Sequence, residues 1–116
     1  MIVGHFPAVT AIEFFGDNAK PQEEGWTISF RRVARNPMAL VEAVEGANVR
    51  AILSGHIHRL DQIEALGQTF ICAGSVSGAK WLGHDHETPE GFGIFDCRPD
   101  GNFEYRYHDY GWNVEV

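Results

Sequence analysis

The stretch Ala51-Ile52-Leu53-Ser54-Gly55-His56-Ile57-His58 carries most of the structural and chemical information in this chain. The segment from Val49 to Leu53 is short and aliphatic, which predicts a buried strand, and Gly55 lacks a Cβ atom where the backbone must turn tightly. Ligands of open α/β sheets collect at the carboxyl ends of the strands. Imidazole is a frequent metal ligand, so His56 and His58 are candidate ligands for one metal centre or for two adjacent ones.

Taken alone, such a His-x-His element is more simply interpreted as two exposed loop histidines. A second element, Met1-Ile2-Val3-Gly4-His5-Phe6-Pro7, has the same order of apolar residues, Gly-His and a proline that stops the strand. Between the two elements, Asn36-Pro37 predicts a helix start and Gly46 predicts its end. A strand, a helix and a second strand form a crossover, so we expect the two strands to lie parallel with both histidine elements at one edge.

The remaining sequence predicts antiparallel hairpins and one irregular region. Two hairpins are expected from alternating segments joined by turns: 62–66 with 70–73, and 92–96 with 103–107. The region from Thr10 to Arg35 is interpreted either as a long insertion that carries a binding loop or as an apolar cap over the sheet. The expected fold class is α/β or α+β, with one main helix, parallel strands that end in histidines, and C-terminal antiparallel hairpins. Residues 1–116 are expected to form a single domain.

Composition sets limits on function. The chain has 116 residues, 44% of them hydrophobic, and a formal net charge of −7, which suits one small domain and argues against binding of a nucleic-acid backbone. The sequence contains no long apolar stretch, so membrane association is not expected. The compartment is not fixed by the sequence, with the cytoplasm slightly favoured. Cys72 and Cys97 are predicted to be reduced core thiols rather than a disulfide, and Trp81 to be a core residue.

In its Gly-His elements the chain resembles the calcineurin-like metallophosphoesterases, whose later motifs are Gly-His followed closely by Pro, and then Gly-His-x-His. The first motif matches Gly4-His5 with Pro7, and the second matches Gly55-His56-Ile57-His58. The resemblance implies a partial metallophosphoesterase β-sandwich with two divalent metal ions, Mn, Fe or Zn. It implies that His5 and His56 bind one ion and that His58 binds the other. It also implies a phosphoester substrate and metal-assisted hydrolysis.

The earlier motifs of that family, Asp-x-His, Gly-Asp-x-x-Asp and Gly-Asn-His-Asp/Glu, are missing from the sequence. The stretch Gly16-Asp17-Asn18-Ala19-Lys20 matches the second only superficially, because Lys20 stands where a carboxylate is needed. No catalytic residue is therefore identified, and we expect the C-terminal half of an enzyme that is active only with its N-terminal half. An open strand edge and an uncovered apolar face near Val3 and Ile52 are expected to bind that half or to self-associate.

Two other interpretations stay open. The chain can be a non-enzymatic metal-binding or interaction module that retains the histidines, or a small hydrolase with one metal that recruits His84 or His86. These two histidines lie in a polar loop, so the simpler expectation is a solvated loop, and the alternative is weak substrate contact at the rim of the site. Three arginines are likewise expected to form a solvated face, with contact to an anionic substrate as the alternative: Arg31, Arg32 and Arg35.

Overall fold

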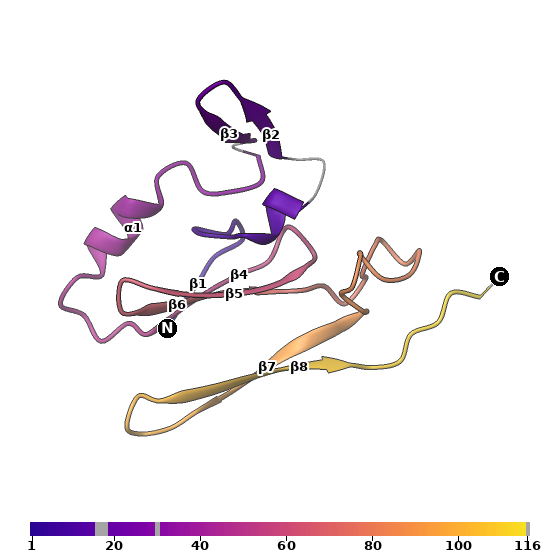
Figure 1. Cartoon of the computed structure of the whole chain (residues 1–116). Helices are drawn as coiled ribbons and strands as arrows, with labels where there is room; N and C mark the ends of the chain where they lie inside the picture. Colours follow the sequence, from indigo (N-terminus) through magenta and orange to yellow (C-terminus); the bar gives the residue numbers. More distant parts are fainter. Residues whose placement is uncertain (16–18, 30, 116) are drawn as a thin grey trace.

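The computed structural model describes residues 1–15, 19–29 and 31–115, and most of the regular elements in this part of the chain are strands. One four-stranded sheet has the order β1-β4-β6-β5, and two hairpins, β2-β3 and β7-β8, lie apart from it (Figure 1). With one α-helix, α1, the chain is of the α+β class, as predicted. Residues 16–18 of the superficial Gly-Asp motif lie outside the described residues. The sheet strands are β1 (Ile2–Val3), β4 (Ala51–Ser54), β5 (Leu60–Ala65) and β6 (Gln68–Ala73).

The predicted crossover is confirmed. β1 pairs with β4 in parallel, with Ile2 opposite Ile52, and α1 (Pro37–Ala43) lies between them in the sequence. The side chain of Asn36 accepts a hydrogen bond of 3.1 Å from the Ala39 N–H and so caps the first turn of the helix. Both Gly-His elements therefore follow neighbouring parallel strands at the same edge of the sheet.

The two predicted hairpins are also present. β5 and β6 pair antiparallel, and β7 (Gly91–Cys97) pairs antiparallel with β8 (Phe103–Asp109). The irregular region from 10 to 35 contains elements that the sequence did not predict. These are a 3₁₀ helix, η1 (Ile12–Phe15), and the strands β2 (Ala19–Gln22) and β3 (Gly25–Ile28). β2 contains Pro21, which is compatible with a strand because a two-stranded hairpin has only edge strands, and edge strands tolerate proline.

One face of the sheet is well packed. Ala8, Ile52 and Phe70 form a buried cluster against which Leu40 and Val41 of α1 pack. Hairpin β7-β8 lies on the other side of the sheet (Figure 1). The expectation of an uncovered apolar face at Ile52 is wrong, because the helix and the segment after β1 leave this side chain only 4% exposed.

The edge and the outer surfaces are less well covered. Val3 on the edge strand β1 is 71% exposed, as expected, and the described part of the chain is flat, with extents of 52 × 46 × 17 Å. Its radius of gyration is 15.3 Å, against about 13 Å for a compact domain of this length. Several large apolar side chains are exposed as well: Phe6, Phe15, Trp26 and Leu82. The described structure therefore leaves apolar surface open to a partner.

Two minor expectations need correction. Cys72 and Cys97 are both free thiols, as predicted, but only Cys72 is buried, since Cys97 lies on an exposed part of β7. Trp81 is half-exposed rather than a core residue, and its ring packs edge-on against Trp112 with 5.4 Å between the ring centroids. None of the helices in the described residues has the length and apolar character needed to cross a membrane.

Candidate metal centre

The carboxyl ends of β1 and β4 are joined by backbone hydrogen bonds that bring the two Gly-His elements together. The Gly4 N–H donates to the Leu53 carbonyl at 2.9 Å, and the Gly55 N–H donates to the His5 carbonyl at 3.1 Å. These bonds extend the parallel pairing of the strands beyond their last residues. The position of His5 beside His56 is thus a direct consequence of strand register.

The two imidazoles are in direct contact. Nδ1 of His56 lies 3.0 Å from Nε2 of His5, and Nε2 of His56 lies 2.7 Å from the carbonyl oxygen of Arg31. A carbonyl oxygen only accepts hydrogen bonds, so Nε2 of His56 carries the proton. In the neutral ring Nδ1 is then the acceptor, and it receives the N–H of His5. We assign the tautomers on this network, and we call His5 and His56 the strand-end pair.

The strand-end pair fits the donor set of a metal ion. Imidazole nitrogens bind zinc at about 2.0–2.1 Å, so two ligand nitrogens of one tetrahedral ion are about 3.3–3.4 Å apart. The 3.0 Å separation in this structure is a few tenths of an ångström shorter, so the two rings would have to move slightly apart to bind one ion. Metal-bound histidines usually donate their second N–H to a carbonyl or a carboxylate, and His56 already does so to Arg31. To bind one ion, both nitrogens would have to give up the proton between them and turn towards a point off the line that joins them, because the bonds to the ion are longer than half of their separation.

His58 is held by a different contact. Its Nδ1 lies 2.9 Å from the carbonyl oxygen of Gly78, which makes Nδ1 the donor and leaves Nε2 as the potential ligand atom. His56 and His58 both have left-handed backbone conformations, with φ of 67° and 61°, and Ile57 between them is only 1% exposed. Such conformations cost about 1–2 kcal/mol for a residue other than glycine. Burial of Ile57 fixes the turn and holds both histidines in this conformation.

His56 and His58 line one surface hollow of about 310 Å³, which we call the histidine hollow. Its other lining residues are Arg32, Ile57, Ala79, Lys80 and Asp85. A larger hollow of about 980 Å³ lies at the opposite end of the strands, beside the turn between β5 and β6. That hollow has no histidine in its lining. The predicted ligands His56 and His58 therefore lie at the smaller hollow, at the carboxyl ends of the parallel strands.

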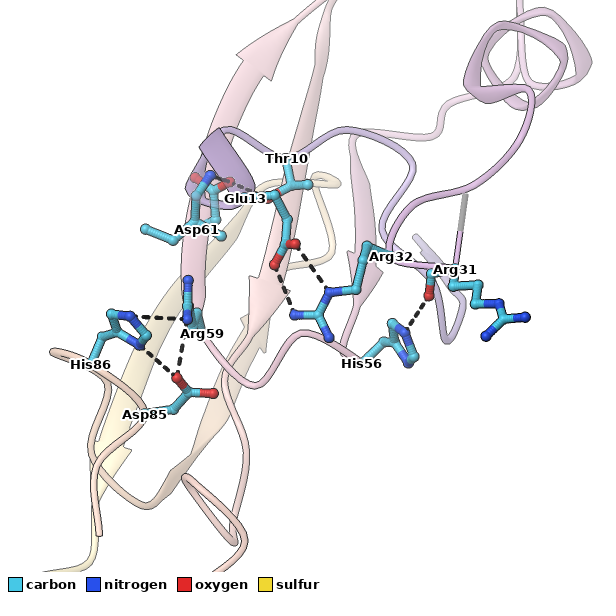
Figure 2. A network of polar contacts seen from close by, with 10 residues as sticks. Thr10, Glu13, Arg31, Arg32, His56, Arg59, Asp61, Asp85 and His86 are labelled. Carbon is cyan, nitrogen blue, oxygen red and sulfur yellow. Dashed lines mark hydrogen bonds and ion pairs between the residues drawn. The ribbon is translucent and has the colours of Figure 1, made fainter. Parts of the chain in front are cut away.

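Arg32 enters the histidine hollow from an ion pair with a buried carboxylate (Figure 2). Its Nε and Nη2 donate to the two oxygens of Glu13 at 3.0 and 2.9 Å, and the Glu13 side chain is fully buried. These hydrogen bonds raise the pKa of Arg32 above its ordinary value. The expectation that the three arginines form a solvated face is wrong for Arg32. No sequence pattern predicts the pairing of Arg32 with Glu13, because the two residues are 19 positions apart.

A second polar network flanks the histidine hollow. Nε of Arg59 donates to Asp85 at 3.1 Å, and His86 contacts both Asp85 and Arg59, at 2.9 and 3.1 Å (Figure 2). Burial raises the pKa of Asp85, but the hydrogen bonds from His86 and Arg59 outweigh it, so the pKa lies below its ordinary value. His84 contacts Glu90 instead, at 3.9 Å. The side chains of His84 and His86 are 55% and 61% exposed, so the loop is solvated, as expected, although both histidines also contact protein groups.

The candidate metal ligands do not form an assembled metal site within the described residues. No group of three or more His, Cys, Asp or Glu side chains within them is arranged to hold a metal ion. The strand-end pair brings two imidazole nitrogens to 3.0 Å from each other, and His58 makes a separate contact with the Gly78 carbonyl. Comparison of the chain with protein-family models, with curated proteins and with solved structures found no match.

Proposed function

We propose that this chain supplies the histidine ligands of a two-metal phosphoester hydrolase of the metallophosphoesterase type. In this proposal a segment outside the 116 residues supplies the carboxylate ligands. The four-stranded sheet and hairpin β7-β8 then belong to the two layers of a partial β-sandwich. The observation that carries the proposal is the 3.0 Å contact between His5 and His56 at the ends of adjacent parallel strands.

The chemistry follows from the donor atoms. When bound, two divalent ions, Mn, Fe or Zn, would supply the Lewis acidity that orients a phosphoester, activates water and stabilises the charge of an in-line displacement. His5 and His56 would hold one ion through Nε2 and Nδ1, and the Arg31 carbonyl keeps the His56 ring in its orientation. His58 would hold the second ion through Nε2, while the Gly78 carbonyl holds its other nitrogen. The chain itself therefore orients the ligands.

The same donor set explains why a partner segment is required. Neutral imidazoles would cancel none of the charge of two divalent ions, whereas carboxylate ligands would cancel part of it. The isolated chain is therefore expected to bind divalent metals weakly. The open edge at β1 and the flat shape of the described structure support docking of a further strand-bearing segment.

The first test of this proposal is to read the coding DNA upstream of Met1 in frame. It should encode Asp-x-His, Gly-Asp-x-x-Asp and Gly-Asn-His-Asp/Glu, in that order. The longer protein should then hydrolyse p-nitrophenyl phosphate with Mn²⁺, and His58→Ala should abolish turnover. The matched control is His108→Ala, because His108 lies on β8 and packs against Phe92. A stop codon and a ribosome-binding site directly upstream would contradict the proposal.

One observation favours a second candidate function. The described residues bring together only two histidine nitrogens, which is a donor set typical of a weak metal-binding module without catalysis. Under this alternative, the 116-residue chain binds one ion at the strand-end pair, and His58→Ala leaves its metal affinity unchanged. The hydrolase proposal requires His58 for a second ion, so metal stoichiometry in the longer protein separates the two.

A further inference from the structure

The histidine hollow combines two potential metal ligands with side chains that carry charge. Arg32, Lys80 and Asp85 line it together with His56 and His58. Its volume of about 310 Å³ is enough for a phosphate group and the first atoms of its ester. Whether the hollow attracts an anion depends on which of the three charges are already balanced by the protein.

The negative charge of Asp85 is balanced locally. Arg59 donates to this carboxylate at 3.1 Å and His86 contacts it at 2.9 Å. The side chain of Arg59 is only 10% exposed, so its charge is directed to Asp85 rather than to solvent. Asp85 therefore contributes little repulsion towards an anion in the histidine hollow.

Arg32 is a fixed donor with unused capacity. Its bonds to Glu13 occupy Nε and Nη2, and a guanidinium has five N–H donors. The Nη1 donors therefore remain for a ligand, on a side chain that is 28% exposed. Because the bidentate ion pair already orders the guanidinium, less conformational entropy is lost when it binds an anion.

Lys80 supplies the charge that the hollow does not otherwise balance. It is exposed, and within the described ranges no carboxylate forms a salt bridge with it. It lies two residues after Gly78, whose carbonyl holds His58, and its backbone is left-handed with φ of 62°. This turn places Lys80 on the same hollow as the candidate ligand atom of His58.

From these contacts we infer that Arg32 and Lys80 form a phosphate-binding subsite selective for a terminal phosphate group with two negative charges. The planar guanidinium donates to phosphate oxygens, and the ammonium adds a mobile point charge. Because Glu13 balances the charge of Arg32, the unbalanced charge is that of Lys80, from which a dianion gains roughly twice the Coulomb energy of a monoanion, while Arg32 adds N–H donors. As a substrate assignment, phosphomonoesters over diesters, the inference rests on the proposed hydrolase function. Binding of phosphate itself does not require the metals.

The test uses the metal-free chain in the presence of a chelator. Inorganic phosphate, mostly dianionic at mildly alkaline pH, is titrated while amide NMR shifts are recorded, and dimethyl phosphate serves as the monoanionic probe. We expect saturable shifts around Arg32 and Lys80, and about tenfold weaker binding of dimethyl phosphate. Lys80→Gln should weaken phosphate binding about fivefold. Lys20→Gln is the matched control, because Lys20 lies on β2 and outside the hollow, and it should leave binding unchanged.

Arg32 is tested with a charge-balanced variant. Arg32→Gln alone leaves the buried Glu13 without its partner and can unfold the chain, so Glu13→Gln is combined with it. The double variant should stay folded and lose phosphate binding. Equal phosphate affinity in Lys80→Gln and the unsubstituted chain, or equal affinity for both probes, would overturn the inference.

A zinc titration separates this inference from the proposed function. Zinc should shift His5 and His56 to the same extent in Lys80→Gln as in the unsubstituted chain, because Lys80 is not a ligand. If phosphate binds as expected but zinc never reaches the histidines, the subsite stands and the hydrolase proposal fails. If zinc binds the histidines but phosphate does not bind at Arg32 and Lys80, the hydrolase proposal stands and the subsite is rejected.

Discussion

Nδ1 of His56 lies 3.0 Å from Nε2 of His5, although the two residues are 51 positions apart in the sequence. Neither flexible loops nor a local motif can produce this contact. It follows from the parallel register of β1 and β4, which sets Val3 opposite Leu53 and so carries both chain segments into the same turn region. The register of the sheet thus places the two histidines side by side at this edge.

The backbone at His56 predicts an unusual order of variant stabilities. Because its φ is 67°, His56→Gly should be more stable than His56→Ala by about 1 kcal/mol. Both variants lack the imidazole, so the difference reports the backbone alone. Urea unfolding measures it. The same pair of substitutions at Met38, inside α1 and exposed, should give the opposite order. Equal stability of the two His56 variants would show that this turn is not strained.

Tyr105 on β8 is predicted to tolerate loss of its hydroxyl group. That oxygen is buried and, within the part of the chain that the structure describes, has no hydrogen-bond partner. Tyr105→Phe should therefore leave the free energy of unfolding near pH 7 unchanged or raise it by about 1 kcal/mol. Tyr107→Phe is the control, because its hydroxyl donates to the Pro89 carbonyl at 2.8 Å, and it should lower stability by about 1 kcal/mol.

The same tyrosine predicts a pH dependence. Burial, with smaller contributions from Tyr107 and Cys72, raises the pKa of Tyr105 from 10.0 to about 12. The contribution of the protonated Tyr105 hydroxyl to the free energy of unfolding is fully present below pH 10. It is lost as the pH rises towards 12, because the unfolded chain releases the proton first. Since the residue is only half-buried, we expect a loss of about 1–2 kcal/mol. Above pH 10, the free energy of unfolding should fall less steeply with pH in Tyr105→Phe than in the unsubstituted chain. Equal slopes in the two proteins would contradict the raised pKa of Tyr105.

The two cysteines should differ in reactivity. Burial raises the pKa of Cys72, although a hydrogen bond with Ser54 at 3.3 Å partly opposes the shift, whereas Cys97 is exposed. A thiol reagent should therefore label one cysteine rapidly in the folded chain and two in denaturant. Mass spectrometry identifies the labelled residue, which we expect to be Cys97. Rapid labelling of Cys72 would indicate that the sheet opens around β6.

The edge strand β1 predicts concentration-dependent self-association of the isolated chain. Val3 is 71% exposed on a strand that has a sheet neighbour on one side only. Light scattering should show species larger than a monomer, and Val3→Lys should reduce their amount, because charge on an edge strand opposes pairing. The exposed Leu66, in the turn between β5 and β6, offers a control substitution, Leu66→Lys. A monodisperse monomer of the unsubstituted chain would contradict this prediction.

Sequence reasoning predicted the parts of the fold that depend on local patterns. The Asn36 cap, the aliphatic strand before Gly55 and the turn at Gly67 all have local signals, and the helix, strand and hairpin are present. Strand boundaries were less accurate: β4 begins at Ala51 rather than Val49. The β2-β3 hairpin was missed because its residues lack clear alternation and include Pro21.

The site was predictable only where the residues themselves are distinctive. Histidines after a glycine at a strand end stand out in any sequence, so the sequence predicts the proximity of His5 and His56 that the structure shows. The partnership of Arg32 with Glu13 and the place of Lys80 beside His58 depend on how loops fold over the sheet. Loop packing of this kind leaves no periodic signal, because each contact joins residues that are distant in the sequence.

The most direct measurement is a long-range proton–nitrogen NMR spectrum of the histidine side chains, recorded without metal and then with excess zinc. Without metal, His56 should carry its proton on Nε2, the atom that faces the Arg31 carbonyl. With zinc, Nδ1 of His56 and Nε2 of His5 should shift together, while His108 stays unchanged. Zinc-induced shifts that leave either ring of the strand-end pair unaffected, or no shifts at all, would contradict the proposed metal site.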